Sequence, residues 1–197
     1  MYMELAILDA IQAHLRCNFF DVMMPLVTKL GNGGILWIIS AAVLLLIPKT
    51  RKIGAAMLVA LGLEVLCCNI ILKPLVARIR PCDVNTAVQL LVSRPTDFSF
   101  PSGHTGASFA AVSVLYFGKT RLWIPAGVIA VLIAVSRLYL YVHYPSDVLV
   151  GALLGIMLGW LGVWLISCWE RRCRADGKAA LIEGSAPSWK IRFFLDK

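Results

Sequence analysis

Residues 148–169 read VLVGALLGIMLGWLGVWLISCW and contain no charged side chain. A helix needs about 20 residues of this kind to cross the hydrocarbon core of a bilayer, so this stretch predicts a membrane-spanning helix. Its glycines Gly151, Gly155 and Gly159 recur about once per helical turn, a spacing that favours close packing against another helix. The stretch therefore predicts one member of a packed bundle of membrane helices.

Four other apolar stretches indicate that the chain crosses the membrane repeatedly. They are residues 26–47, 54–72, 104–117 and 122–140. The composition agrees, because 59% of the residues are hydrophobic, only 15% are charged and the mean hydropathy is +0.80, values that exclude an ordinary soluble domain. We therefore predict an all-α, polytopic transmembrane helix bundle with about five to six membrane helices.

The two ends of the chain differ from this apolar middle. Residues 1–20 place apolar side chains near helical spacing but include Asp9 and His14, which makes the segment too polar to cross. We predict that it forms an amphipathic helix lying at the membrane interface. Residues 21–170 are then one membrane-embedded domain, and the basic residues that follow predict a cytoplasmic tail at 171–197.

The positive charges in the short loops predict how the bundle is oriented. Counting alternate crossings, three groups of basic residues fall on the same face of the membrane. They are Lys49, Arg51 and Lys52, then Lys119 and Arg121, then Arg171, Arg172 and Arg174. Cytoplasmic loops carry an excess of Lys and Arg, so we expect this face to be cytoplasmic and the protein to be a multi-pass protein of the cytoplasmic membrane.

Three polar segments on the opposite face break this charge pattern. They read KPLVARIRP at residues 73–81, PSGH at 101–104 and SRLYLYVHYPSD at 136–147. Ionisable groups next to hydrocarbon are costly and are usually retained for a partner or a reaction. The cations in these segments therefore predict an anionic ligand on the extracytoplasmic side.

The residue types in these segments suit a phosphate group. Lys73, Arg80 and Arg137 can neutralise its oxygens, and the two guanidinium groups offer bidentate contacts. Ser102 and Gly103 stand where a helix is predicted to begin, so a hydroxyl and exposed backbone N–H groups can bind another oxygen. These five residues are the predicted phosphate ligands.

His104 and His143 can divide the remaining chemistry between them. Imidazole is a competent nucleophile near neutral pH, so one ring can attack phosphorus while the other protonates the departing oxygen. Asp147 lies one helical turn after His143, where its carboxylate can accept the other ring N–H and fix the tautomer. The six cysteines show no metal-ligand spacing, and we expect free thiols, no metal and no other cofactor.

Taken together, the three segments resemble the signature of the type 2 phosphatidic acid phosphatase superfamily, which is Lys-x6-Arg-Pro, Pro-Ser-Gly-His and Ser-Arg-x5-His-x3-Asp. Every specified residue is matched between Lys73 and Asp147. The resemblance implies a helical membrane enzyme that hydrolyses phosphate esters or diphosphates without a metal. It also implies that His143 is the nucleophile, that His104 is the general acid and then the general base, and that a phosphohistidine is formed.

The expected partners are a lipid phosphate substrate and the bilayer, with no nucleic acid, and the sequence leaves the oligomeric state open. The resemblance offers undecaprenyl diphosphate, phosphatidylglycerophosphate, phosphatidic acid and related prenyl diphosphates as substrates. The small size and short loops are similar to those of bacterial members of the family, and a polyprenyl diphosphate is the first expectation. The signature is also similar to that of vanadium haloperoxidases, which are soluble proteins and fit this apolar chain less well. A further alternative is a non-enzymatic transporter or binder of anionic lipid headgroups, although binding alone needs no nucleophile, orienting carboxylate and proton donor.

Other polar residues lie close to these segments. Ser136 is expected to add a phosphate contact, whereas Arg78 and Arg94 are interpreted as rim charges or exceptions to the charge pattern rather than direct ligands. Glu64 lies inside the second apolar stretch, and two interpretations are open for it. It is either a partner of a basic residue of the site or a structural contact between helices.

Overall fold

The computed structural model describes residues 2–182, and within them the chain forms helices and connecting loops without a β-strand, which confirms the predicted all-α fold. The helices are α1 (Tyr2–Leu15), α2 (Asn18–Leu30), η1 (Asn32–Gly34), α3 (Ile35–Leu46), η2 (Pro48–Thr50), α4 (Arg51–Glu64), the π-helix η3 (Val65–Leu72), α5 (Lys73–Val76), α6 (Pro81–Val84), α7 (Gly103–Phe117), α8 (Trp123–Tyr139) and α9 (Pro145–Ile182). Residues 1 and 183–197 lie outside the described range, and with them most of the predicted tail.

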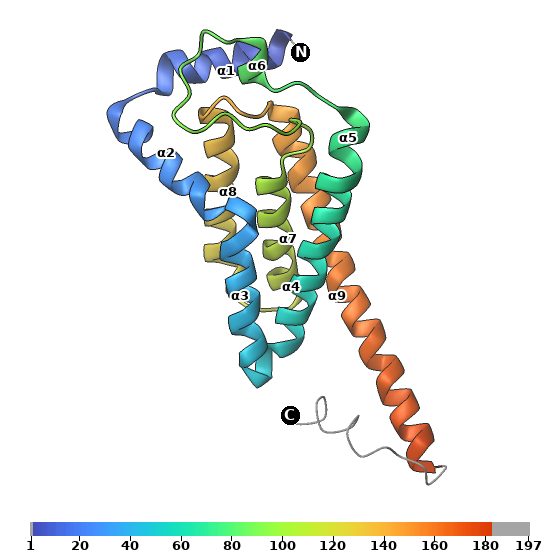
Figure 1. The fold of residues 1–197 in the computed structure, drawn as a ribbon. Helices are drawn as coiled ribbons and strands as arrows, with labels where there is room; N and C mark the ends of the chain where they lie inside the picture. The colour runs from blue at the N-terminus through green and yellow to red at the C-terminus, as the bar shows by residue number, and fades with distance from the viewer. Residues whose placement is uncertain (1, 183–197) are drawn as a thin grey trace.

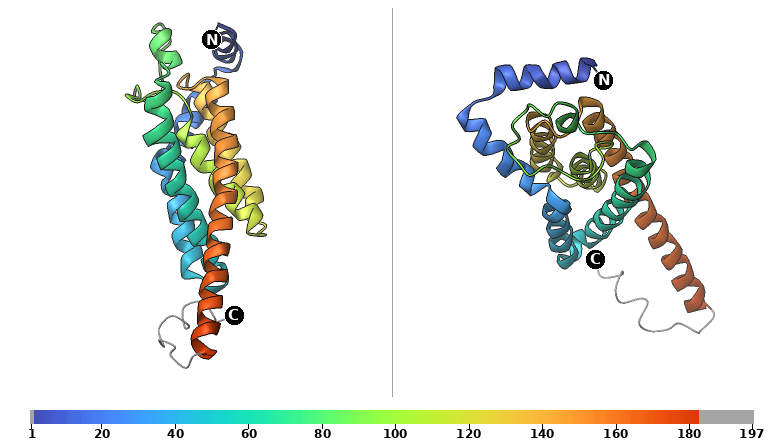
Figure 2. Two further views of the ribbon diagram at one scale, coloured as in Figure 1. Left: turned by 90° about the vertical axis from the view of Figure 1, so that its right-hand side faces the viewer. Right: turned by 45° about the horizontal axis from the view of Figure 1, so that its top comes forward.

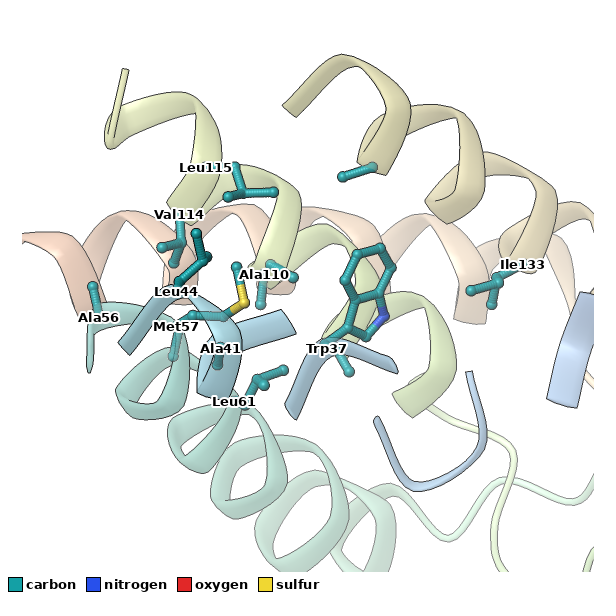
Figure 3. Packing of buried hydrophobic residues seen from close by; sticks show 14 residues of the cluster. Trp37, Ala41, Leu44, Ala56, Met57, Leu61, Ala110, Val114, Leu115 and Ile133 are labelled. Atoms are coloured by element: carbon teal, nitrogen blue, oxygen red, sulfur yellow. The ribbon is translucent and has the colours of Figure 1, made fainter. Parts of the chain in front are cut away.

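The long helices run side by side, and α7 lies in the middle of the bundle with α3, α4, α8 and α9 around it (Figure 1, Figure 2). Apolar side chains of α3, α4, α7 and α8 interlock in its core, where Trp37, Met57 and Val114 are buried (Figure 3). Trp37 also donates from Nε1 to the Ser108 hydroxyl over 3.0 Å, so its polar atom is satisfied inside the core.

The glycines of α9 bring its backbone against that of α7. A Cβ atom built on Gly151, Gly155 or Gly159 would lie 2.7, 2.3 or 2.5 Å from a backbone oxygen of the facing segment. Side-chain carbons do not fit at such distances, so only glycine permits this approach. The close packing predicted from the glycine spacing is confirmed. Because Gly151 faces Ser102, the packing also sets the start of α7 beside the start of α9.

The first crossing is made by two helices rather than one. α2 and α3 are bent by 43° relative to each other across the GNGG turn. Gly33 and Gly34 have left-handed backbone conformations there, with φ of 57° and 66°, which residues with a Cβ atom rarely adopt. The stretch predicted at 26–47 is therefore split at this turn, which carries Asn32 to the start of α7.

By length and apolar composition, two helical segments can cross a membrane, Pro48–Val84 and Pro145–Ala175, and the bent pair α2 and α3 makes a third. α8 has 17 residues and α7 has 15, so each lies at or below the usual length of a span. The predicted polytopic bundle is confirmed, although neither α7 nor α8 passes the test for a membrane span by itself.

α1 lies across the upper end of the bundle and covers the turn between α8 and α9 (Figure 1). Its Leu8 is fully buried with Tyr141 and Tyr144, and Asp9 accepts a 2.6 Å hydrogen bond from the Tyr141 hydroxyl. The predicted location of this helix at the membrane interface stays a prediction. At the other end of the chain, α9 continues through the predicted domain boundary at residue 170 to Ile182.

Candidate active site

The three polar segments meet at one end of the bundle, below α1 and the loop between α6 and α7 (Figure 1). Arg80 of the first segment contacts His143 of the third. In the second segment, the backbone N–H of Ser102 donates to the carbonyl oxygen of Asp147 over 3.1 Å. Residues far apart in the sequence thus form one polar cluster.

His143 lies in the short turn between α8 and α9 and is 1% exposed. Its Nε2 atom is 3.2 Å from Nη1 of Arg80. Because a guanidinium N–H can only donate, Nε2 is the acceptor and the ring proton lies on Nδ1. Nδ1 faces Oδ2 of Asp147 at 3.5 Å, a long contact, and has no hydrogen-bond partner within the described residues. The unprotonated Nε2, which is the nitrogen able to attack phosphorus, therefore faces the cations.

The surroundings of His143 keep its ring neutral. Burial lowers the pKa of the ring most, Asp147 opposes this effect, and the charges of Arg137 and Arg80 add to it, so that the pKa falls to about 3. The neutral imidazole is the form that acts as a nucleophile. At neutral pH His143 therefore has the neutral ring that its predicted role as nucleophile requires.

Asp147 is fully buried and is held by donors that the motif did not include. Nη1 of Arg78 donates to it over 2.5 Å, the Ser99 hydroxyl over 2.5 Å and the Tyr144 backbone N–H over 2.9 Å. The interpretation of Arg78 as a rim charge is wrong, because it also pairs with Glu4 at 2.6 Å and lies 3.9 Å from the centre of the Tyr144 ring. Arg78 and Ser99 instead hold the Asp147 carboxylate beside His143.

A carboxylate contacts the two cations of the first motif. Asp97, in the loop before α7, pairs with Lys73 and accepts a 2.6 Å hydrogen bond from Nη2 of Arg80. Although burial raises the pKa of Asp97, the hydrogen bond from Lys73 and the charges of Arg80 and Lys73 prevail and lower it to about 2. Asp97 is thus an internal anion on the side chains that were predicted to bind phosphate.

Arg137 is a buried cation whose guanidinium group has an N–H donor without a hydrogen-bond partner among the described residues. It is 5% exposed, its Nη1 donates to the Thr28 hydroxyl over 2.6 Å, and its Nε has no hydrogen-bond partner within the described residues. A buried charge without a matching anion is strongly unfavourable, so this position suits an anionic ligand. The Ser136 hydroxyl donates to the Ile133 carbonyl over 2.6 Å and is therefore engaged within α8 rather than in the expected phosphate contact.

His104 lies in the first turn of α7, and its Nε2 is 2.9 Å from Oδ1 of Asn32 in the GNGG turn. This contact leaves Nδ1 for a second partner. The charge of Arg137 is close enough to act on the His104 ring. Asn32 was not predicted as a residue of the site. The one feature of the sequence that could have indicated it is the GNGG turn around it, which interrupts an apolar stretch.

Ser102 caps α7, in agreement with the predicted helix start. Its side-chain oxygen accepts from the Thr105 backbone N–H at 3.5 Å and lies 2.9 Å from the Thr105 hydroxyl. The helix begins at Gly103, so its first backbone N–H groups are free of helical partners and can bind an anion.

Two further predictions concern the rim of the cluster and a metal. Arg94 pairs with Asp83 at 2.9 Å and both side chains are largely exposed, which agrees with the interpretation of Arg94 as a rim charge. Within the part of the chain that the structure describes, no group of three or more His, Cys, Asp or Glu side chains could hold a metal ion. The metal-free and cofactor-free reaction stays a prediction.

Comparisons with known proteins agree with the motif. The sequence matches the model of the PAP2 superfamily over residues 53–171, which contain all three polar segments. A relative named undecaprenyl-diphosphatase, from Sulfolobus acidocaldarius, is 35% identical over 74% of this chain and 70% of its own length. A relative named phosphatidylglycerophosphatase B, from Bacillus subtilis, is 35% identical over 75% of this chain and 68% of its own length.

The fold agrees with that of a solved membrane phosphatase. The crystal structure of a transmembrane PAP2-type phosphatidylglycerolphosphate phosphatase from Bacillus subtilis is similar to this chain with a TM-score of 0.68 and 31% sequence identity. The similarity covers 87% of this chain and 86% of the other. It therefore extends over most of the helical bundle.

Proposed function

This chain belongs to the PAP2 superfamily and is a membrane lipid phosphatase, and we propose that it works through a phosphohistidine on His143 without a metal ion. The observation that carries this proposal is the contact from Arg80 to Nε2 of His143, which leaves the reactive lone pair facing the cations. The substrate phosphate binds Lys73, Arg80 and Arg137. In doing so it replaces the Asp97 carboxylate on the first two of them.

In the first step, Nε2 of His143 attacks phosphorus, the N–P bond forms and the bond from phosphorus to the leaving oxygen breaks. His104 in its protonated form gives its proton to that oxygen. The positive charge that develops on the His143 ring is balanced by Asp147, which faces Nδ1. The phosphate-binding cations stabilise the charge on the other phosphate oxygens.

In the second step, water takes the place of the departed group. His104, now neutral, removes a proton from the water as its oxygen attacks phosphorus, and the electron pair of the N–P bond returns to Nε2 of His143. Inorganic phosphate is released and both histidines recover their starting states. Asn32 holds the His104 ring through Nε2 in both steps.

The proposed substrate is a membrane lipid that carries a phosphate monoester or a diphosphate. Relatives named for each kind of substrate are equally similar to the chain, at 35% identity. The polyprenyl diphosphate favoured by the sequence therefore stays a prediction. The alternative of a headgroup transporter or binder gains no support from the pairing of His143 with Asp147, since binding alone needs no oriented nucleophile.

We further propose that the site faces the extracytoplasmic side of the cytoplasmic membrane. Lys52, near the start of α4, pairs with Glu170 of α9 at the end of the bundle away from α1 (Figure 1). Arg171 and Arg174 follow at the same end. Because Lys and Arg concentrate in cytoplasmic loops, this distribution supports an outward orientation of the opposite end, where the polar cluster lies.

The test is phosphate release by the purified protein in detergent with EDTA present, offered undecaprenyl diphosphate, phosphatidylglycerophosphate and phosphatidic acid. We expect release to survive chelation, to fall at least about 10³-fold in His143→Ala and to be unchanged in the control His14→Ala. His14 is exposed and lies in α1, outside the polar cluster. Loss of activity on chelation, or equal activity of His143→Ala, contradicts the proposal.

A further inference from the structure

A cavity of about 220 Å³ lies beside His104, between the GNGG turn and helices α3, α4 and α7. Glycines and apolar side chains make most of its wall, and Glu64, Asn69 and His104 are its polar members. Within the described residues, no lysine or arginine lines it. The cavity is thus next to the proposed proton donor, and no phosphate-binding cation is part of its described wall, although the charge of Lys73 acts on Glu64.

Glu64 is the unusual member of this wall. It ends α4 and is 2% exposed, yet its Oε1 atom has no hydrogen-bond partner within the described residues. An unpaired carboxyl oxygen inside a membrane bundle is unfavourable and is commonly retained for a function. Its surroundings therefore point to a ligand that supplies the missing donor.

The fold makes room for this carboxyl group against α7. A Cβ atom on Gly106 would lie 2.6 Å from Oε1 of Glu64, and one on Gly103 would lie 3.7 Å from it. A side chain at position 106 would therefore exclude the Glu64 carboxyl group from its observed position. The carboxyl group lies against the first turn of α7, the turn that carries His104.

The backbone changes form directly after Glu64. The segment Val65–Leu72 is π-helical, a rare conformation that often occurs at functional sites. It carries Asn69, whose Oδ1 is 3.3 Å from the Cβ position of Gly103. A second polar group thus flanks the cavity near His104.

The reaction geometry assigns this cavity to the leaving group. His104 protonates the departing oxygen, which lies roughly in line with the attacking Nε2 of His143 on the far side of phosphorus. The part of the lipid attached to that oxygen then extends past His104. A cavity of about 220 Å³ has room for a small headgroup, while the apolar chains stay in the bilayer.

We propose that Glu64 is a specificity-determining residue, which accepts a hydrogen bond from a hydroxyl of the leaving group next to the phosphate ester. This inference rests on the proposed function and narrows its substrate to phosphate monoesters of a hydroxyl-bearing headgroup, such as a glycerol. A diphosphate would place its second phosphate against the Glu64 carboxyl group, in a wall without lysine or arginine among the described residues. Such a contact between acidic groups disfavours the polyprenyl diphosphate that the sequence favoured.

The first experiment needs no variant. Wild-type protein is assayed with phosphatidylglycerophosphate, with its analogue in which hydrogen replaces the hydroxyl beside the ester carbon, and with undecaprenyl diphosphate. We expect kcat/KM to be at least about tenfold higher for the hydroxyl-bearing lipid than for either of the others, because a hydrogen bond to an acidic group is lost. Equal or higher kcat/KM for the analogue or for the diphosphate overturns the inference.

The second experiment assigns the preference to Glu64. In Glu64→Leu the hydroxyl lipid should lose its advantage over the analogue, while kcat/KM for the analogue stays within about threefold of wild type. Glu64→Gln keeps an acceptor oxygen and should restore part of the preference. Glu170→Gln, which changes a carboxylate at the far end of the bundle, serves as the control. An equal fall on both lipids in Glu64→Leu shows a structural role and contradicts the proposal.

The two proposals fail in different ways. If turnover does not depend on His143, the proposed function itself is wrong. If turnover depends on His143 but shows no preference for the hydroxyl, the histidine mechanism stands and only the role of Glu64 is overturned.

Discussion

Nη1 of Arg80 lies 3.2 Å from Nε2 of His143, and the direction of this hydrogen bond determines which nitrogen of the histidine is free of a proton. The same guanidinium holds Asp97 through Nη2 at 2.6 Å. One arginine therefore joins an internal anion to the nucleophile in the free protein. In the proposed mechanism, a substrate phosphate that binds Arg80 displaces the Asp97 carboxylate and then lies next to Nε2 of His143.

Asp97 competes with phosphate for Lys73 and Arg80, so Asp97→Asn should bind phosphate-shaped anions more tightly. We expect inhibition by inorganic phosphate or vanadate at several-fold lower concentration, together with a lower KM, because the neutral amide is displaced more easily. Steady-state kinetics with both inhibitors measures the change. Asp83→Asn is the control, since Asp83 pairs with the surface residue Arg94. Weaker inhibition in Asp97→Asn shows instead that the carboxylate is needed to position the cations.

The buried neutral ring of His143 makes stability depend on pH. Its pKa is about 3 in the folded protein, whereas an exposed histidine has a pKa of about 6.5. Between these values the unfolded chain binds a proton that the folded chain does not, so the stabilisation is complete above about pH 6.5 and decreases as the pH falls toward 3. In His143→Gln this slope, at most about 1.4 kcal/mol per pH unit, should be lost. Unfolding in detergent between about pH 7 and about pH 5 tests it, and equal slopes in both proteins contradict the assignment.

Arg78 acts on the reaction through Asp147, so its removal should change kcat more than KM. In Arg78→Met we expect kcat to fall about 10- to 100-fold with KM within about threefold of wild type, because the carboxylate loses a 2.5 Å donor. Arg78→Lys should recover part of the activity. Arg94→Met, at the exposed pair with Asp83, should behave like wild type. A rise in KM with unchanged kcat identifies Arg78 as a substrate ligand instead.

Gly155 permits the contact between α7 and α9. A Cβ atom there would lie 2.3 Å from the Gly106 backbone oxygen, so Gly155→Ala should separate the helices and destabilise the protein by about 2 kcal/mol or more. Apart from the chain neighbours of Gly62 and the backbone of its own helix, no described atom lies within 4 Å of its Cβ position, so Gly62→Ala should be neutral or slightly stabilising. Thermal unfolding of both variants gives the comparison. Equal stability of the two variants contradicts the packing described for α9.

The features that were predicted correctly from the sequence depend on residues that are close together in the chain. The glycine stripe of 148–169, the helix start at Ser102 and the one-turn spacing from His143 to Asp147 each depend on residues close together in the chain. Helix geometry alone brings such residues onto one face. Motif order then allowed the three polar segments to be assigned to one site.

The residues that were missed depend on tertiary packing. Arg78 reaches Asp147 across 69 positions and Glu4 across 74, and no spacing rule connects them. Asp97 lies in an irregular loop, and no periodic pattern in the sequence predicts the path of such a loop. Asn32 contacts His104 because α2 and α3 are bent relative to each other at the GNGG turn. The apolar stretches at 104–117 and 122–140 form helices of only 15 and 17 residues, so apolar composition alone did not show whether each crosses the membrane by itself.

The proposed mechanism requires a covalent bond between phosphorus and His143, and trapping this intermediate tests the mechanism most directly. In His104→Gln, an aryl phosphate whose leaving group needs no proton should still phosphorylate the enzyme, while hydrolysis of the intermediate is slowed for want of a base. Alkaline quenching and peptide mass spectrometry should then find one phosphoryl group on His143, and none when His143→Ala is combined with this variant. A phosphoryl group on another residue, or none while the wild-type enzyme still releases phosphate from the same substrate, contradicts the phosphohistidine mechanism.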